Sequence, residues 1–323
     1  MTPAAELLRS EIATRGPISF RRFMEIALYH PEHGYYFQKR DPFGKQGDYF
    51  TASQLQPVFG ILMARLAQQL YQAMGRPGDF SIVELGPGRG EMAAYFSTWK
   101  YVPVDVGRGE IPDRFRGLLF TNEFFDALPV HKVELHNGRW HETLVDYRDG
   151  RFCFLRGPEV DEDLGNYIRS YLAAGPLLAP DQQIEANLEA LLIFRDVDRR
   201  MDSGFAVIID YGYTERELLR FPRGTLMSYR EHQAVDDVLL SPGEQDITAH
   251  VNFTALERFA LTLGWNVARR ESFGSLLAYI GEADQFREAL GYGNDQQRWL
   301  QLKTLLYGMG DTFSVLLLEK PQK

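Results

Sequence analysis

The feature that most constrains this chain is a glycine-rich turn that directly follows a short, mainly apolar segment. The apolar segment covers residues 80–83, and the turn reads Glu84-Leu85-Gly86-Pro87-Gly88-Arg89-Gly90. A helix-compatible stretch follows at residues 91–96. Strand, glycine turn and helix in this order open a nucleotide-binding α/β sheet, in which the glycines let the backbone approach a ligand and let the helix pack on the strand.

The spacing of the glycines narrows the class of ligand. A dinucleotide-binding turn reads Gly-x-Gly-x-x-Gly, whereas here the third glycine comes one residue early. A phosphate-binding loop needs Gly-Lys-Ser or Gly-Lys-Thr, and this turn contains no lysine. An adenosyl ligand without phosphates, such as S-adenosylmethionine, fits the spacing better. The alternative is an ordinary strand-to-helix connection whose glycines bind nothing.

Composition excludes several other classes of function. The net charge of −9 argues against non-specific binding to nucleic acid. The one cysteine, Cys153, leaves no internal disulfide framework and no cysteine-rich zinc site. No long uncharged apolar run is present, and residues 1–15 do not resemble a signal peptide. We therefore expect a soluble, cytoplasmic protein without a membrane span.

The pattern along the chain predicts one main domain with additions. Residues 1–75 are predicted to be an N-terminal, mainly helical segment, and residues 76–323 a single α/β domain with an insertion at about 130–202. Within the insertion, Asn137-Gly138 and Asp149-Gly150 predict hairpin turns. Residues 160–202 are predicted to be helical. Strands are predicted at 81–85, 101–106, 117–121, 205–210, 265–269 and 312–319, and helices at 254–263 and 273–306.

A second chemically suggestive segment follows the predicted strand at residues 117–121. It contains Asn122, Glu123 and Asp126, at the carboxyl end of a parallel strand, which is where such sheets bind ligands. Two carboxylates on one turn can hold a guanidinium by bidentate hydrogen bonds and can accept a proton. The alternative is that Asp126 caps the next turn and Glu123 faces water.

Several short motifs occur in order along the chain. They are Gly16-Pro17-Ile18, Gly34-Tyr35-Tyr36, Gly47 to Ser53, Val83 to Gly90, Asn122 to Val130, Asp210-Tyr211-Gly212, Gly224-Thr225-Leu226 and Asp246 to Phe253. Taken together, these motifs resemble the MidA family of class I S-adenosylmethionine-dependent methyltransferases. The resemblance runs from about residue 10 to the C-terminus. Mitochondrial members are protein arginine methyltransferases that act on a subunit of respiratory complex I.

This resemblance implies S-adenosylmethionine as cofactor and an arginine side chain of a protein as methyl acceptor. Glu123 would bind the acceptor, assisted by Asp126 or His250. A homodimer is compatible with the sequence but not required by it. Two alternatives stay open, namely a methyltransferase for a small molecule or another side chain, and a non-catalytic assembly factor. The residues implied to bind the cofactor are Thr51, Ser53, Glu84, Gly86, Pro87, Gly88, Gly90 and Asn122.

One departure from the family pattern concerns the region after the glycine turn. Family members have a second strand ending in an acid, a helix and a third strand there, whereas only residues 98–116 fill this space. The sheet is therefore predicted to be one strand short. Asp105 is the candidate to bind the ribose hydroxyls of the cofactor. It could equally belong to the third strand, with the second strand missing.

Overall fold

The computed structural model describes residues 1–38, 52–172, 178–230, 233–235, 237–291, 293 and 295–322. The chain forms two compact units, each assembled from three separate stretches. The N-terminal unit comprises residues 1–50, 125–192 and 213–255, and the sheet unit comprises residues 51–124, 193–212 and 256–323. Helix α3 (Val58–Ala73) therefore belongs with the sheet, although the sequence suggested grouping it with residues 1–75.

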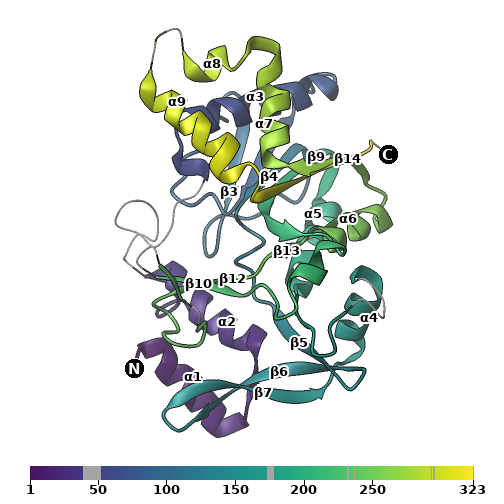
Figure 1. Ribbon diagram of the computed structural model, residues 1–323. Helices are drawn as coiled ribbons and strands as arrows, with labels where there is room; N and C mark the ends of the chain where they lie inside the picture. Colours follow the sequence, from purple (N-terminus) through teal and green to yellow (C-terminus); the bar gives the residue numbers. More distant parts are fainter. Residues whose placement is uncertain are drawn as a thin grey trace. The chain divides into compact units, whose positions relative to one another are not determined.

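The sheet unit contains the α/β sheet that the glycine turn predicts. Its strands lie in the order β14-β15-β9-β4-β2-β3, and β14, β9, β4 and β3 are labelled in Figure 1. Strands β3, β2, β4 and β9 are parallel to one another, whereas β15 is antiparallel to both β9 and β14. The predicted strands are confirmed as β2 (Phe80–Leu85), β3 (Lys100–Val104), β4 (Phe115–Asn122), β9 (Met201–Tyr213), β14 (Asn266–Ser272) and β15 (Phe313–Lys320).

A hydrophobic core joins this sheet to its helices. Helix α3 presents an apolar face in which Val58, Leu62, Leu66 and Leu70 recur every four residues, and all four are buried. Burying each such side chain contributes roughly 1.5–3 kcal/mol. Helices α5 (Leu188–Arg200), α6 (Phe253–Thr262), α7 (Phe273–Gly281), α8 (Arg287–Leu290) and α9 (Gln296–Lys303) follow along the chain, with a π-helical turn at Thr304–Met309 and a 3₁₀ turn at Glu282–Asp284.

The connection between β2 and β3 differs from the prediction. No helix forms at residues 91–96. Successive tight turns replace it, with hydrogen bonds from the Gly90 N–H to the Pro87 carbonyl (2.7 Å) and from the Ala93 N–H to the Gly90 carbonyl (3.0 Å). The chain must return to the start of β3 within residues 86–99, and these turns still bury Met92 and Phe96. In the described part of the chain nothing pairs with the outer edge of β3, so the shortened sheet is confirmed.

The N-terminal unit contains a second, antiparallel sheet in the order β1-β6-β5-β8, with β7 paired to β6. Both predicted hairpin turns are confirmed, because Asn137 and Gly138 have φ of 50° and 77° and Asp149 and Gly150 have φ of 50° and 80°. The strands are β1 (Ile18–Ser19), β5 (His131–His136), β6 (Arg139–Arg148), β7 (Arg151–Glu159) and β8 (Gln183–Ala186).

The prediction that residues 160–202 are all helical is wrong in part. Helices α4 (Glu162–Tyr171) and α5 form, but residues 183–186 form β8, which pairs with β5. A run this short carries no decisive periodicity, and its pairing with β5 decides the outcome. The remaining elements of this unit are α1 (Pro3–Arg15), α2 (Phe20–Tyr29), β10 (Met227–Arg230), β11 (Gln233–Val235), β12 (Asp246–Thr248), β13 (Val251–Asn252) and 3₁₀ turns at Tyr35–Phe37 and Glu217–Arg220.

Among the helices that the structure describes, none has the length and apolar character needed to cross a bilayer.

Candidate active site

The glycine turn lies at the carboxyl end of β2 and is fixed to the neighbouring strand. The Gly86 N–H donates to the Val104 carbonyl at the end of β3, at 3.0 Å. Gly86 and Gly88 have φ of 69° and 54°, which favours glycine. A Cβ atom on Gly86 would lie 2.9 Å from Cδ2 of Phe124. The turn is therefore held close to the segment after β4 and leaves no room for a side chain at Gly86.

Glu84 lies in β2 beneath this turn and is almost completely buried, at 3% exposure. One carboxylate oxygen, Oε2, accepts a hydrogen bond from the Tyr101 hydroxyl of the neighbouring strand. Burial raises the pKa of Glu84 to about 7, and the carboxylates of Glu91 and Asp105 act in the same direction, whereas the Tyr101 hydroxyl opposes the rise. The same burial raises the pKa of Tyr101.

Asp105 follows β3 directly, and the structure settles which strand it belongs to. Strand β3 pairs in parallel with β2, with Val104 opposite Leu85, so Asp105 lies beside the glycine turn. Its Oδ1 accepts from the Val106 N–H at 2.8 Å. Burial raises the pKa of Asp105. The position is that of the acid after the second strand; its contact with a ribose stays a prediction.

Glu123 begins the turn after β4, next to the glycine turn. Its backbone has φ of 53°, in the left-handed region, and its N–H donates to the Ile209 carbonyl of β9 at 2.9 Å. Oε1 of Glu123 accepts from the Ala52 N–H and from Nδ2 of Asn122, each at 3.1 Å. The carboxylate is thus oriented by the protein rather than simply facing water.

Asn122 supplies a feature typical of a ligand site. The residue is 8% exposed, and its Oδ1 has no hydrogen-bond partner within the described residues. Since buried acceptors are normally paired, this oxygen is suited to accept from a donor group of a bound ligand. Ser53 lies in the 3₁₀ turn Ala52–Gln54, one residue after the N–H that contacts Glu123. The prediction for Thr51 lies outside the described residues.

Asp210, at the carboxyl end of β9, received no individual role from the sequence. It is completely buried, its Oδ2 accepts from the Phe124 N–H at 3.2 Å, and its Oδ1 accepts from the Tyr211 N–H at 2.8 Å. A carboxylate at the end of a parallel strand was the available signal. Tyr101, the partner of Glu84, was missed as well, because an aromatic residue within a strand reads as part of the core.

The other two predicted catalytic residues belong to the N-terminal unit. Asp126 is 7% exposed, and its backbone carbonyl accepts from the Ala249 N–H at 2.9 Å, which brings its segment next to His250. The His250 N–H donates to Oγ1 of Thr225 at 3.0 Å, and its ring packs against Phe221. Burial lowers the pKa of His250. Their roles at an acceptor stay predictions.

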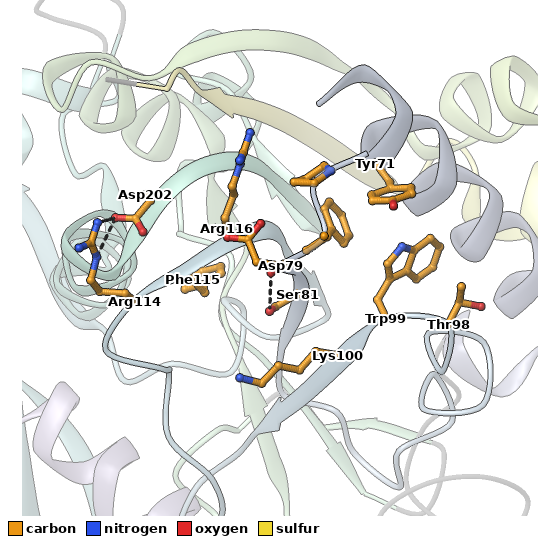
Figure 2. Close-up of a pocket in the computed structure, with 13 residues that line it drawn as sticks. Tyr71, Asp79, Ser81, Thr98, Trp99, Lys100, Arg114, Phe115, Arg116 and Asp202 are labelled. Atoms are coloured by element: carbon orange, nitrogen blue, oxygen red, sulfur yellow. Dashed lines mark hydrogen bonds and ion pairs between the residues drawn. The ribbon is translucent and has the colours of Figure 1, made fainter. Parts of the chain in front are cut away.

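A cavity of about 510 Å³ lies at the opposite ends of the same strands, where β2, β3, β4 and β9 begin. Arg114 in its wall is already paired with Asp202 at 2.7 Å. Figure 2 shows Lys100 and Arg116 pointing away from each other, so these cations do not converge on one ligand group. The cavity does not belong to the glycine turn. Among the described residues no cluster of His, Cys, Asp and Glu could hold a metal ion.

Comparison with known proteins decides the family. A family model described as "Putative S-adenosyl-L-methionine-dependent methyltransferase" matches residues 98–270, which is more than half of the chain. The chain belongs to this family. The MidA-type assignment made from the sequence is confirmed, and the protein is an S-adenosylmethionine-dependent methyltransferase.

Relatives and a solved structure agree with this methyltransferase fold. The chain is 28% identical to the mitochondrial protein arginine methyltransferase NDUFAF7 homolog of Drosophila melanogaster, over 80% of this chain and 70% of the relative. It is 26% identical to human NDUFAF7, over 80% of this chain and 69% of the relative. A Burkholderia thailandensis structure bound to S-adenosyl-homocysteine superposes with a TM-score of 0.86 at 28% identity, covering 99% of this chain and 92% of the other.

The residues at the carboxyl edge of this methyltransferase's sheet fit the cofactor. Only glycine fits at Gly86, where a Cβ would meet Phe124. The carboxylates of Glu84 and Asp105 lie beneath and beside this turn and would suit a cofactor that carries positive charge, and Asn122 offers a buried acceptor. We would place the cofactor against these residues.

Proposed function

We propose that this methyltransferase transfers a methyl group to an arginine side chain of a protein. The observation that carries the proposal is the Glu123 carboxylate, which two hydrogen bonds orient at the end of β4 beside the glycine turn. A carboxylate binds a guanidinium by charge-assisted hydrogen bonds. The relatives compared above are named protein arginine methyltransferases, which points to the same acceptor.

The chemistry divides between cofactor and protein. The cofactor, when bound, supplies an activated methyl group. Glu123 would hold the acceptor guanidinium so that one nitrogen is aligned for attack, and its negative charge would stabilise the positive charge on the methylated group. Asp126 and His250 are the proposed candidates to take the proton that the nitrogen loses. Phe124 and Tyr211 would exclude water from the site.

Incubation with labelled S-adenosylmethionine and a lysate of the host organism tests the acceptor class. Acid hydrolysis of the labelled protein should release methylarginine. Label in small molecules or in another amino acid would contradict the proposal. The family resemblance makes a subunit of respiratory complex I the first purified protein to test as substrate.

Glu123→Gln tests the residue assignment. The amide keeps the shape of the side chain but removes its charge, so turnover should fall about a hundredfold or more, while binding of S-adenosylhomocysteine stays unchanged. Glu319→Gln, which alters an exposed carboxylate of the same unit, is the matched control and should keep full activity. Normal turnover of Glu123→Gln would place the acceptor site elsewhere.

A further inference from the structure

We propose that Asp210 is a positioning residue that fixes the direction of Glu123 without itself touching cofactor or acceptor. The inference rests on the proposed function, in which Glu123 binds the acceptor. It concerns the hydrogen bond that Oδ2 of Asp210 accepts from the Phe124 N–H.

The turn after β4 holds Glu123 in an uncommon backbone conformation. Its φ of 53° lies in the left-handed region, which is unfavourable for a residue with a Cβ. Such a conformation persists only where surrounding contacts impose it. A turn of this kind is therefore expected to have specific anchors on both sides of Glu123.

These anchors come from the neighbouring strand, β9. Strands β4 and β9 pair in parallel up to Asn122 and Ile209. One residue further, the Glu123 N–H still reaches the Ile209 carbonyl. The next N–H, that of Phe124, is bound by the side chain of Asp210. The Asp210 carboxylate thus continues the contact between the two strands into the turn.

Both oxygens of the Asp210 carboxylate act as hydrogen-bond acceptors. Asp210 is completely buried, and a buried charge needs hydrogen-bond donors. Its two oxygens each accept from one backbone N–H, from Phe124 and from Tyr211. A carboxamide offers only one accepting oxygen, so its NH₂ group would face one of the two N–H donors. The isosteric change Asp210→Asn therefore removes one anchor while keeping the volume of the side chain.

The consequence concerns the reaction. With the turn fixed, Oε1 of Glu123 meets the Ala52 N–H and the Asn122 amide. Without the Asp210 hydrogen bond the turn is less constrained, so the Glu123 carboxylate can move away from these two donors. A misplacement of about 1 Å near the reacting groups can reduce turnover roughly a hundredfold. The glycine turn has its own anchor at Val104, so cofactor binding should persist.

The experiment compares Asp210→Asn with Asp198→Asn, using the full chain. Asp198 is a matched control, because it lies in the same unit and accepts from Nε1 of Trp265 and Nζ of Lys320, away from the turn. In Asp210→Asn the Phe124 amide should exchange with deuterium roughly tenfold faster or more, and kcat should fall roughly a hundredfold. Calorimetric affinity for S-adenosylhomocysteine should not change. The control should lose thermal stability only.

A double-mutant cycle separates positioning from a general structural defect. If Asp210 acts through Glu123, the variant carrying both Asp210→Asn and Glu123→Gln should have the kcat of the slower single variant. A double variant whose loss of kcat equals the product of the two single losses would overturn the inference. An unchanged rate of deuterium exchange at the Phe124 amide in Asp210→Asn would overturn it as well. If Asp210→Asn does not fold, replacing Phe124 by phenyllactic acid exchanges its N–H for an ester oxygen and so removes the donor to Asp210. Normal turnover of that variant would also overturn the inference.

The outcomes also distinguish this inference from the proposed function. Normal turnover in Asp210→Asn beside an impaired Glu123→Gln overturns the positioning role alone. Normal turnover in Glu123→Gln overturns the acceptor role of the turn, and the positioning inference with it.

Discussion

Glu84 should make the stability of the protein depend on pH, and Glu84→Gln should remove that dependence. The carboxyl group is 3% exposed, and burial raises its pKa from an ordinary value of 4.5 to about 7. Because the folded-state pKa is the higher one, the folded protein holds this proton where the unfolded chain has released it. The stabilisation is fully present below about pH 4.5 and is lost as pH rises through about 7.

The size of the effect follows from the two pKa values of Glu84. A rise from 4.5 to about 7 corresponds to about 3 kcal/mol of stability lost once the buried carboxylate is ionised. Glutamine cannot ionise, and its amide oxygen can still accept from the Tyr101 hydroxyl. The free energy of unfolding of Glu84→Gln minus that of the wild type should therefore increase by about 2–3 kcal/mol between about pH 5 and pH 8.5.

Urea denaturation followed by tryptophan fluorescence measures this difference at a series of pH values. All other titrating groups are shared by the two proteins, so their contributions largely cancel. Tyr101→Phe is a second variant. Since the Tyr101 hydroxyl lowers the pKa of Glu84, its loss should move the transition to higher pH. A difference in stability that stays constant across the series would refute the reasoning.

Three further predictions concern the cofactor turn and the N-terminal unit. Gly86→Val should abolish binding of S-adenosylhomocysteine in calorimetry, because its Cβ would meet Phe124 at 2.9 Å. The control Gly75→Val should bind normally, because Gly75 also has a positive φ but a Cβ there would have no atom within 4 Å. S-adenosylmethionine is more positively charged than S-adenosylhomocysteine, so its relative affinity should increase as pH rises through about 7, where Glu84 ionises. Glu84→Gln should not show this increase. The same pH dependence of the affinity ratio in wild type and variant would contradict the prediction. Ser19→Ala should lower the free energy of unfolding by about 1 kcal/mol, because the Ser19 side chain caps the N-terminus of α2. Urea denaturation measures this, and an unchanged urea midpoint would show that the cap is dispensable.

Much of the sheet unit could be predicted from the sequence. Strands β2, β4 and β9 are apolar runs bounded by glycine or polar residues, and the glycine turn after β2 indicates an α/β sheet. The hairpins of the N-terminal unit were equally predictable, because Asn-Gly and Asp-Gly adopt the positive φ angles that tight turns require.

Other parts depended on tertiary contacts that no local pattern encodes. Residues 91–96 have helix-compatible side chains, but the short distance along the chain to β3 imposes tight turns. Residues 183–186 form a strand only because β5 offers a partner edge. In the candidate site, Glu84 and Glu123 were predicted from motifs, and Asp105 was predicted from its place after a strand. The contact of Asp210 with Phe124 joins residues far apart in the sequence, so periodicity could not reveal it.

The alternation of the chain between its two compact units has a practical consequence. Neither unit is a continuous piece of sequence, since the peptide passes from one to the other after residues 50, 124, 192, 212 and 255. A protein cut at residue 75 would separate α3 from the core in which Phe59 packs against Phe273. A fragment cut at one of these crossings would leave at least one unit incomplete and is therefore expected to be inactive, so point substitutions are the way to dissect this enzyme.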